Sequence, residues 1–133
     1  MTTPTASNRI VVDSSGWVEY LGSGPKADEF AIYLESTAIQ FLPSIVVYEV
    51  CKKLFREQTK QIAYLFISRA FAFGDHLIPL TLELSILASQ LSLEFRLTMA
   101  DAIIYATACH LKAQLITSDA HFSELPGSLF YSF

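Results

Sequence analysis

Short apolar runs alternate with longer helical stretches along the whole chain, and this alternation limits the fold more than any other feature. The first run, Arg9–Asp13, is rich in β-branched residues and ends in a carboxylate, which is typical of a buried strand. Strands separated by helices or helix pairs predict a three-layer α/β/α fold, in which a central parallel sheet carries helices on both faces. The further expected strands are Ala38–Leu42, His76–Leu80, Gln114–Thr117 and, after the Pro126-Gly127 turn, Leu129–Phe133.

Helices are expected between these strands, and capping or turn residues mark several of their ends. Ser14 is the expected cap of the first helix, which ends at the Gly22–Pro25 turn. Ser44, Thr81 and Thr98 are suited to begin later helices in the same way. The predicted helices are Ser15–Leu21, Lys26–Glu35, Ser44–Gln58, Lys60–Phe73, Thr81–Phe95 and Thr98–Lys112.

The length and composition fit one globular domain. A chain of 133 residues is able to bury a core without disulfides. We expect a single domain over residues 9–133, preceded by a flexible polar lead-in at residues 1–8. Hydrophobic residues form 52% of the sequence and charged residues 17%. This balance predicts apolar surface that is available for a partner interface.

We expect neither export nor membrane insertion. The polar N-terminal residues lack the apolar core of a secretory signal, and charged or turn residues interrupt the apolar runs well before twenty positions. Cys51 and Cys109 lie in apolar helical stretches and are expected to be buried, reduced thiols. These features favour a cytoplasmic protein.

Acidic residues follow two of the predicted strands. Asp13 ends the first strand, and Asp119 lies just beyond the fourth. Because open parallel sheets bind ligands beyond the carboxyl ends of their strands, both side chains are expected at one edge. Asp101 lies in the first turn of the helix that begins near Thr98. It fits a capping box with Thr98 or a third acid at this edge, and the two roles are compatible.

Glu49 is the most unusual acid because it lies in the apolar stretch Ile45–Val50, where burying an unpaired carboxylate is costly. One interpretation is an exposed helix face with a Glu–Lys pair. The other is a stripe that guides nucleic-acid phosphates toward the acidic edge. While the helix persists, this face also carries the basic residues at i+4, i+7 and i+11 from Glu49, which are Lys53, Arg56 and Lys60, and Lys52 borders it.

Carboxylates crowded at one edge point to a bound cation. Such groups repel one another, and some bind protons unless a cation lies between them. A hard divalent ion relieves the repulsion and prefers oxygen ligands. It also activates water and neutralises charge on a phosphodiester. The net charge of −4 argues against a nucleic-acid binder, but a bound metal would supply the positive charge that RNA meets.

Four stretches of the chain resemble the PIN-domain family, and most closely its VapC-type toxins from toxin–antitoxin pairs. Their order and spacing extend over nearly the whole predicted domain. The stretches are IVVDSS with Asp13, PSIVVYEVCKKL with Glu49, LTMADAIIYATA with Asp101 and LITSDAHFSELPG with Asp119.

The resemblance implies a Mg²⁺- or Mn²⁺-dependent endoribonuclease with a flanked parallel sheet. It also implies a homodimer, alone or in a larger toxin–antitoxin assembly, and a cognate antitoxin whose C-terminal segment occupies the cleft. By this resemblance, Asp13 and Asp101 would be the main metal ligands. Glu49 would support the metal or its water, and Asp119 would complete the acidic cluster.

Three further residues are interpreted through the resemblance. Ser14 and Thr117 match hydroxyl positions that orient carboxylates or waters in the family, although ordinary turn or cap bonding explains them equally well. Trp17 lies where aliphatic residues are more usual. A core or dimer-contact role is favoured for Trp17 over stacking on a base.

Two other functions remain open from the sequence. Asp13 at a strand end would also suit a phosphoacceptor or phosphatase-like domain, with Asp13 as a covalent nucleophile, but the chain offers no good lysine near a later strand end. In a non-catalytic interaction module, the acids would only cap helices and stay solvated. Labelling of Asp13 by acetyl phosphate would support the phosphoacceptor, and finding at most one of the four acids within reach of a common ion would favour the interaction module.

Overall fold

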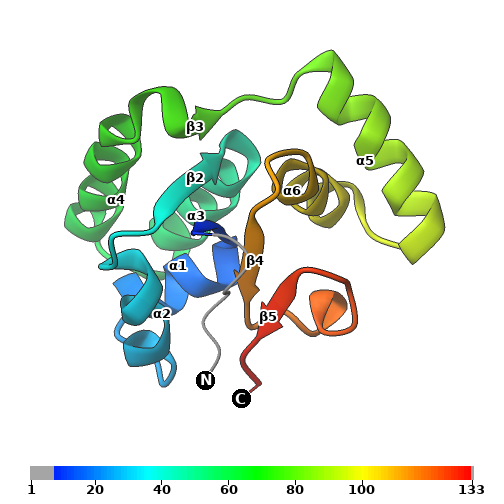
Figure 1. The fold of residues 1–133 in the computed structure, drawn as a ribbon. Helices are drawn as coiled ribbons and strands as arrows, with labels where there is room; N and C mark the ends of the chain where they lie inside the picture. The colour runs from blue at the N-terminus through cyan, green and yellow to red at the C-terminus, as the bar shows by residue number, and fades with distance from the viewer. Residues whose placement is uncertain (1–7, 133) are drawn as a thin grey trace.

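The computed structural model describes residues 8–132, which form a parallel sheet flanked by helices (Figure 1). The strands are β1 (Arg9–Val12), β2 (Ile39–Pro43), β3 (Leu77–Ile78), β4 (Gln114–Thr117) and β5 (Ser128–Phe130). The α-helices are α1 (Ser14–Leu21), α2 (Ala27–Leu34), α3 (Ser44–Glu57), α4 (Lys60–Ala72), α5 (Leu82–Phe95) and α6 (Met99–His110). Two short 3₁₀ turns are η1 (Gly74–His76) and η2 (Ala120–Phe122). Apart from Asn8, the predicted lead-in lies outside the described residues, and so does Phe133 at the end of the predicted fifth strand.

The sheet has the strand order β3-β2-β1-β4-β5, and each neighbouring pair is parallel. β1 lies in the middle, with Val11 opposite Phe41 of β2 and Val12 opposite Ile116 of β4. All carboxyl ends of the strands therefore meet at one edge of the sheet. The residues just after β1 and β4 become neighbours there, although more than a hundred positions separate them.

Helices cover both faces of the sheet, which confirms the predicted three-layer α/β/α fold. In Figure 1, α1, α2 and α4 lie on one side, and α5 and α6 lie on the other. Helix α3 contacts both α1 and α6, so it bridges the two layers. Because both faces are covered, the central strand is buried, and Ile10 and Val11 are almost fully excluded from solvent.

The packing of α1 explains two residues that follow the first acid. Trp17 is 1% exposed and packs edge-on against Phe66 and Phe73, so it belongs to the core and is not free to stack on a base. At Gly16, an added Cβ would lie 2.6 Å from side-chain atoms of Phe30 and Val12. Only glycine permits α1 to begin this close to β1 and α2.

Several helix starts differ from the predicted ones. Asp13, rather than Ser14, caps α1, because its carboxylate accepts a hydrogen bond from the Gly16 amide. Pro43 occupies the cap position of α3, so Ser44 is the first helical residue and caps nothing. Thr81 caps α5 through the Leu84 amide, as predicted.

The third strand and one cysteine also depart from expectation. β3 has only two residues instead of His76–Leu80, because His76 belongs to η1 and Pro79 has no amide for a ladder hydrogen bond. Cys109 is exposed rather than buried, since it lies in the last turn of α6, and Cys51 is half-buried. Both thiols are free. Within residues 8–132, no helix has the combined length and apolarity that a bilayer crossing requires.

Candidate active site

The candidate site begins where β1 and β4 end side by side. The Asp13 amide donates a hydrogen bond to the Ile116 carbonyl at 3.1 Å, which continues the ladder one residue beyond β1. This register brings the Asp13 side chain against Thr117, the last residue of β4. The Thr117 hydroxyl donates to Asp13 Oδ2 at 2.8 Å.

Asp13 is held rigidly and away from solvent. Its Oδ1 accepts hydrogen bonds from the Ser15 hydroxyl at 2.6 Å and from the Gly16 amide at 3.2 Å. The side chain is almost fully buried, at 1% exposure. Burial raises the pKa of Asp13 to about 7, against the opposing effect of the hydrogen bonds from Ser15, Thr117 and Gly16, and the charge of Asp119 raises it further.

Asp119 connects this pair to the loop after β4. Its amide donates to the Thr117 hydroxyl at 2.8 Å, so Thr117 joins Asp13 to Asp119. The Asp119 carboxylate accepts a hydrogen bond from the His121 amide at 2.9 Å and caps η2. Its Oδ1 also lies 2.9 Å from the ring nitrogen Nδ1 of His121.

Asp101 reaches the same edge from the N-terminal end of α6. Its Oδ2 lies 3.7 Å from His121 Nδ1. The Thr98 side chain makes no cap hydrogen bond to the helix and interacts instead with the Asp101 side chain, so the predicted capping box does not form. Burial raises the pKa of Asp101, and the charge of Asp119 adds to this rise.

Glu49 joins the cluster from α3. Its Oε1 accepts a hydrogen bond of 2.9 Å from the Ser14 hydroxyl at the start of α1. Partial burial raises the pKa of Glu49, and the charges of Asp101 and Asp119 raise it further. Ser14 thus orients a carboxylate, which is one of the two roles that the sequence left open for it.

The four predicted acids converge at the carboxyl edge of the sheet. Asp119 interacts electrostatically with each of the other three, and Glu49 also interacts with Asp101. The raised pKa values come first from burial of these carboxyls and second from their mutual negative charge. Carboxylate oxygens from separate elements are the donor set that a hard divalent cation prefers, so the residues fit such an ion. One ligand atom from each of Asp101, Asp119 and His121 lies within 4.8 Å of the others.

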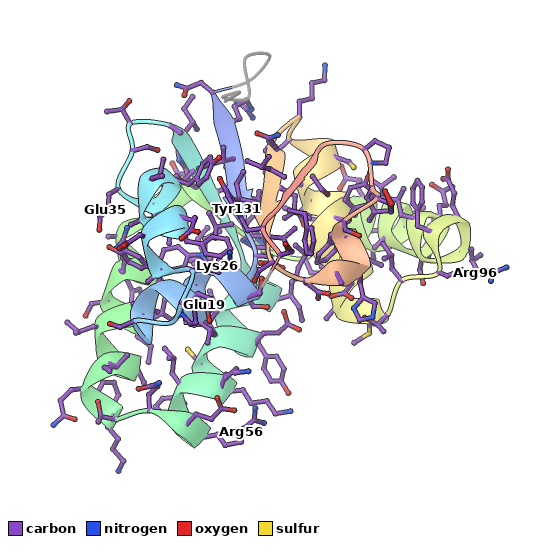
Figure 2. The ribbon with its side chains drawn as sticks, turned by 90° about the horizontal axis from the view of Figure 1, so that it is seen from below. Glu19, Lys26, Glu35, Arg56, Arg96 and Tyr131 are labelled. Atoms are coloured by element: carbon purple, nitrogen blue, oxygen red, sulfur yellow. The ribbon has the colours of Figure 1, made fainter. Side chains whose placement is uncertain are left out.

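A cavity of about 500 Å³ opens beside this cluster. Glu49 and Asp119 line it together with three basic residues of α3, namely Lys52, Lys53 and Arg56. Figure 2 shows Arg56 near the C-terminal end of α3, far from Arg96 in the turn after α5. The predicted Glu49–Lys53 pair is replaced by contacts of Lys53 and Arg56 with Glu57, at 3.9 Å and 3.0 Å.

Lys60 does not share this cavity, and its place in the predicted basic stripe is wrong. α3 ends at Glu57, and Gln58 adopts an extended conformation. Lys60 then begins a separate helix, α4, after the Thr59 cap. The spacing of i+11 from Glu49 holds only while one helix persists, and the break between the two predicted helices lies before Lys60.

Five residues at the site were not singled out from the sequence. Ser15 bonds to Asp13, and its hydroxyl also accepts from the Ser118 amide. The five residues are Ser15, Glu19, Tyr48, Ser118 and His121. The only sequence signal for them was proximity to Asp13 or Asp119, or a polar or aromatic side chain beside Glu49.

Known proteins match this arrangement in fold. A toxin–antitoxin complex from Klebsiella pneumoniae contains a chain with 20% identity and a TM-score of 0.72, over 93% of this chain and 99% of that one. The sarcin-ricin loop cleaving toxin VapC20 of Mycobacterium tuberculosis has 18% identity and a TM-score of 0.71, over 89% and 95%. FitAcB from Neisseria gonorrhoeae has 18% identity and a TM-score of 0.71, over 92% and 96%.

Sequence comparison gives the family directly. A search of curated protein sequences finds no match. The family model of the PIN domain, in contrast, matches residues 10–128, which include the four converging acids. The chain therefore belongs to the PIN-domain family.

Proposed function

We propose that the protein is a metal-dependent endoribonuclease that hydrolyses RNA phosphodiester bonds, with residues 9–133 as a single nuclease domain. One observation carries this proposal. Carboxylates from four different parts of the chain lie together at one sheet edge, and burial and mutual charge raise the pKa of three of them. Buried carboxyls that also repel one another do not stabilise a fold, and the arrangement suits a cation. The acids are Asp13, Glu49, Asp101 and Asp119.

The proposed cofactor is Mg²⁺ or Mn²⁺. Asp13 and Asp101 are the proposed main ligands, while Glu49 supports the ion or its water and Asp119 completes the set. When bound, such an ion supplies an activated water and neutralises charge on the scissile phosphate. The chain itself orients the ligands, since hydroxyls of Ser15 and Thr117 fix both oxygens of Asp13 and the Ser14 hydroxyl fixes Glu49.

RNA is the proposed substrate, and the basic side of the cavity supports this. Lys52, Lys53 and Arg56 line the same cavity as Glu49 and Asp119. Cationic side chains beside a metal-loaded acidic cluster would hold phosphates on either side of the scissile bond. The overall charge of −4 is compatible with this role because three cationic side chains line this cavity and a bound cation would offset the acids.

The proposed biological role is that of a toxin neutralised by a cognate antitoxin in the cytoplasm. The similar structures from Klebsiella pneumoniae and Salmonella typhimurium carry toxin–antitoxin and VapBC in their names, which supports this assignment. Large apolar side chains on α3 and α4 offer surface for a protein partner or a homodimer. They include Phe55, Tyr64, Leu65 and Phe71, each more than half exposed.

The geometry disfavours the two alternatives. A phosphoacceptor is disfavoured because the described partners of the Asp13 side chain are two hydroxyls, a backbone amide and another acid, with no lysine among them. A non-catalytic module with solvated acids would not bury Asp13 and Asp101.

The test is cleavage of a mixed single-stranded RNA by the purified chain in EDTA, Mg²⁺ or Mn²⁺. We expect cleavage only with a divalent ion, and none with Asp101→Asn or Glu49→Gln. Asp75→Asn, which removes an exposed acid in η1, is the matched control and should cleave normally. Cleavage at the wild-type rate by folded Asp101→Asn protein, or undiminished cleavage in EDTA, would overturn the assignment.

A further inference from the structure

We propose that His121 is a nitrogen ligand of the cation held by Asp101 and Asp119, and that this ligand makes the site prefer Mn²⁺ and similar transition ions to Mg²⁺. The proposal deepens the metal-dependent function above and rests on it. His121 is not one of the four acids, and its nitrogen would make the site bind Mn²⁺ more tightly than Mg²⁺.

The spacing of the three side chains fits a single ion. His121 Nδ1 lies 2.9 Å from Asp119 Oδ1 and 3.7 Å from Asp101 Oδ2. With bonds of about 2.1 Å, neighbouring ligand atoms of an octahedral ion lie about 3 Å apart and opposite ones about 4.2 Å apart. The distance of 2.9 Å is close to the value for neighbouring ligand atoms, and the distance of 3.7 Å lies between the two values. The three ligand atoms all lie within 4.8 Å of one another, so one ion could be reached by small side-chain rotations.

The position of His121 is maintained by the backbone while its ring is free to meet a ligand. The His121 amide donates to Asp119 Oδ1, which fixes η2 against the acid. The side chain itself is 73% exposed, so the ring contributes nothing to the core. Among the described contacts, the ring's partners are the two carboxylates. An exposed imidazole whose contacts are two carboxylates is placed to bind a cation together with them and does not contribute to core packing.

A second observation at the same loop points to a missing partner. Ser118 is 8% exposed and lines the cavity with Asp119, yet its hydroxyl has no hydrogen-bond partner among the described residues. Buried hydroxyls are nearly always hydrogen-bonded in folded proteins. This unsatisfied hydroxyl belongs to the residue directly before Asp119, on the loop that also carries His121.

The nature of the donors sets the preference among ions. Carboxylate and water ligands alone suit Mg²⁺ and Mn²⁺ about equally, whereas an imidazole nitrogen favours transition ions over Mg²⁺. Mg²⁺ keeps most of its water and is bound through few carboxylates. An imidazole therefore adds affinity for Mn²⁺ and very little for Mg²⁺.

The first experiment measures affinity for both ions on the metal-stripped full chain. Free Mn²⁺ is followed by electron paramagnetic resonance, and Mg²⁺ is added as a competitor. We expect His121→Ala to weaken Mn²⁺ binding roughly 10- to 100-fold and to change Mg²⁺ binding far less. His121→Gln keeps a hydrogen-bond donor for Asp119 but lacks an imidazole, so it should behave like the alanine variant. His110→Ala removes another exposed histidine, at the end of α6, and should change neither affinity.

The second experiment detects the nitrogen itself. Pulsed electron paramagnetic resonance of the Mn²⁺-loaded protein should show a nitrogen coupling that changes when histidine is labelled with ¹⁵N. The chain has only three histidines, so the assignment is direct. The coupling should vanish in His121→Ala and persist in His110→Ala.

Two results would overturn the inference. If the nitrogen coupling is absent in the wild type, His121 is not a ligand. If His121→Gln restores Mn²⁺ binding, or if His121→Ala weakens both ions by the same factor, the residue only positions Asp119. Either result, obtained with a protein that still cleaves RNA, would leave the nuclease assignment intact. Nitrogen coupling in a protein that cleaves no RNA would support the ligand and contradict the nuclease.

Discussion

Thr117 donates a hydrogen bond of 2.8 Å to Asp13 across 104 positions of sequence. The same hydroxyl accepts from the Asp119 amide at 2.8 Å. One buried side chain at the end of β4 therefore fixes the acid after β1 and begins the loop that carries Asp119. A hydroxyl is suited to this position because it donates and accepts at the same time.

Thr117→Val should uncouple these two acids. Valine has nearly the same shape but leaves Asp13 Oδ2 and the Asp119 amide without their partner, which costs about 1–3 kcal/mol of stability. We expect divalent-ion affinity, measured by calorimetry, to fall roughly 10- to 100-fold. Thr107→Val is the matched control. Thr107 is equally buried, but its hydroxyl donates to the Ile103 carbonyl within α6, so this variant should keep its ion affinity. Equal affinities for the two variants would contradict the coupling.

The burial of Asp13 should make the metal-free protein less stable as the pH rises. Its pKa is raised from 3.8 to about 7 on folding, so the folded state binds a proton that the unfolded state has already released. The stabilisation is complete below about pH 4 and is lost as the pH rises through 7. The free energy of unfolding, measured by urea denaturation in EDTA, should fall over this range more steeply in the wild type than in Asp13→Asn. Parallel pH dependence in the two proteins would show that Asp13 is not the group responsible.

Gly16→Ala should destabilise the fold through a steric clash. The new Cβ would lie 2.6 Å from Phe30 and Val12 side-chain atoms in a packed core, and we expect a loss of about 1–3 kcal/mol. The melting temperature measures it. Phe30→Leu removes the clashing ring atoms, so the double variant should lose less than the sum of the single changes. Strict additivity would show that the clash is relieved elsewhere.

The basic residues of the cavity should contribute to RNA binding according to their position. In an Asp101→Asn background, Lys52→Ala and Arg56→Ala should each weaken binding and reduce the slope of log affinity against log salt by about 0.7 per lost phosphate contact. Fluorescence anisotropy with a labelled single strand measures both quantities. Lys60→Ala is the control, since Lys60 lies in α4 outside the cavity. An effect of Lys60→Ala as large as that of Lys52→Ala would contradict the proposed path of the RNA.

The sequence by itself determined the order of the elements and the edge at which Asp13 and Asp119 would lie. These features depend on local patterns, namely β-branched runs that end in acids and helical stretches between them. A parallel sheet then places all carboxyl ends of its strands together. The placement of Glu49 in an apolar helix also indicated a special role, because such a carboxylate needs a partner.

Only the tertiary structure decided how the side chains meet. The register of β1 against β4 set the Thr117–Asp13 bond. The packing of α6 against the loop after β4 brought His121 between Asp101 and Asp119. Such contacts join residues on separate elements, and no local pattern encodes the distance between them. Residues close together in the sequence determine each helix and strand. The burial of the acids, their mutual repulsion and the distances between metal-ligand atoms arise only when the elements pack together.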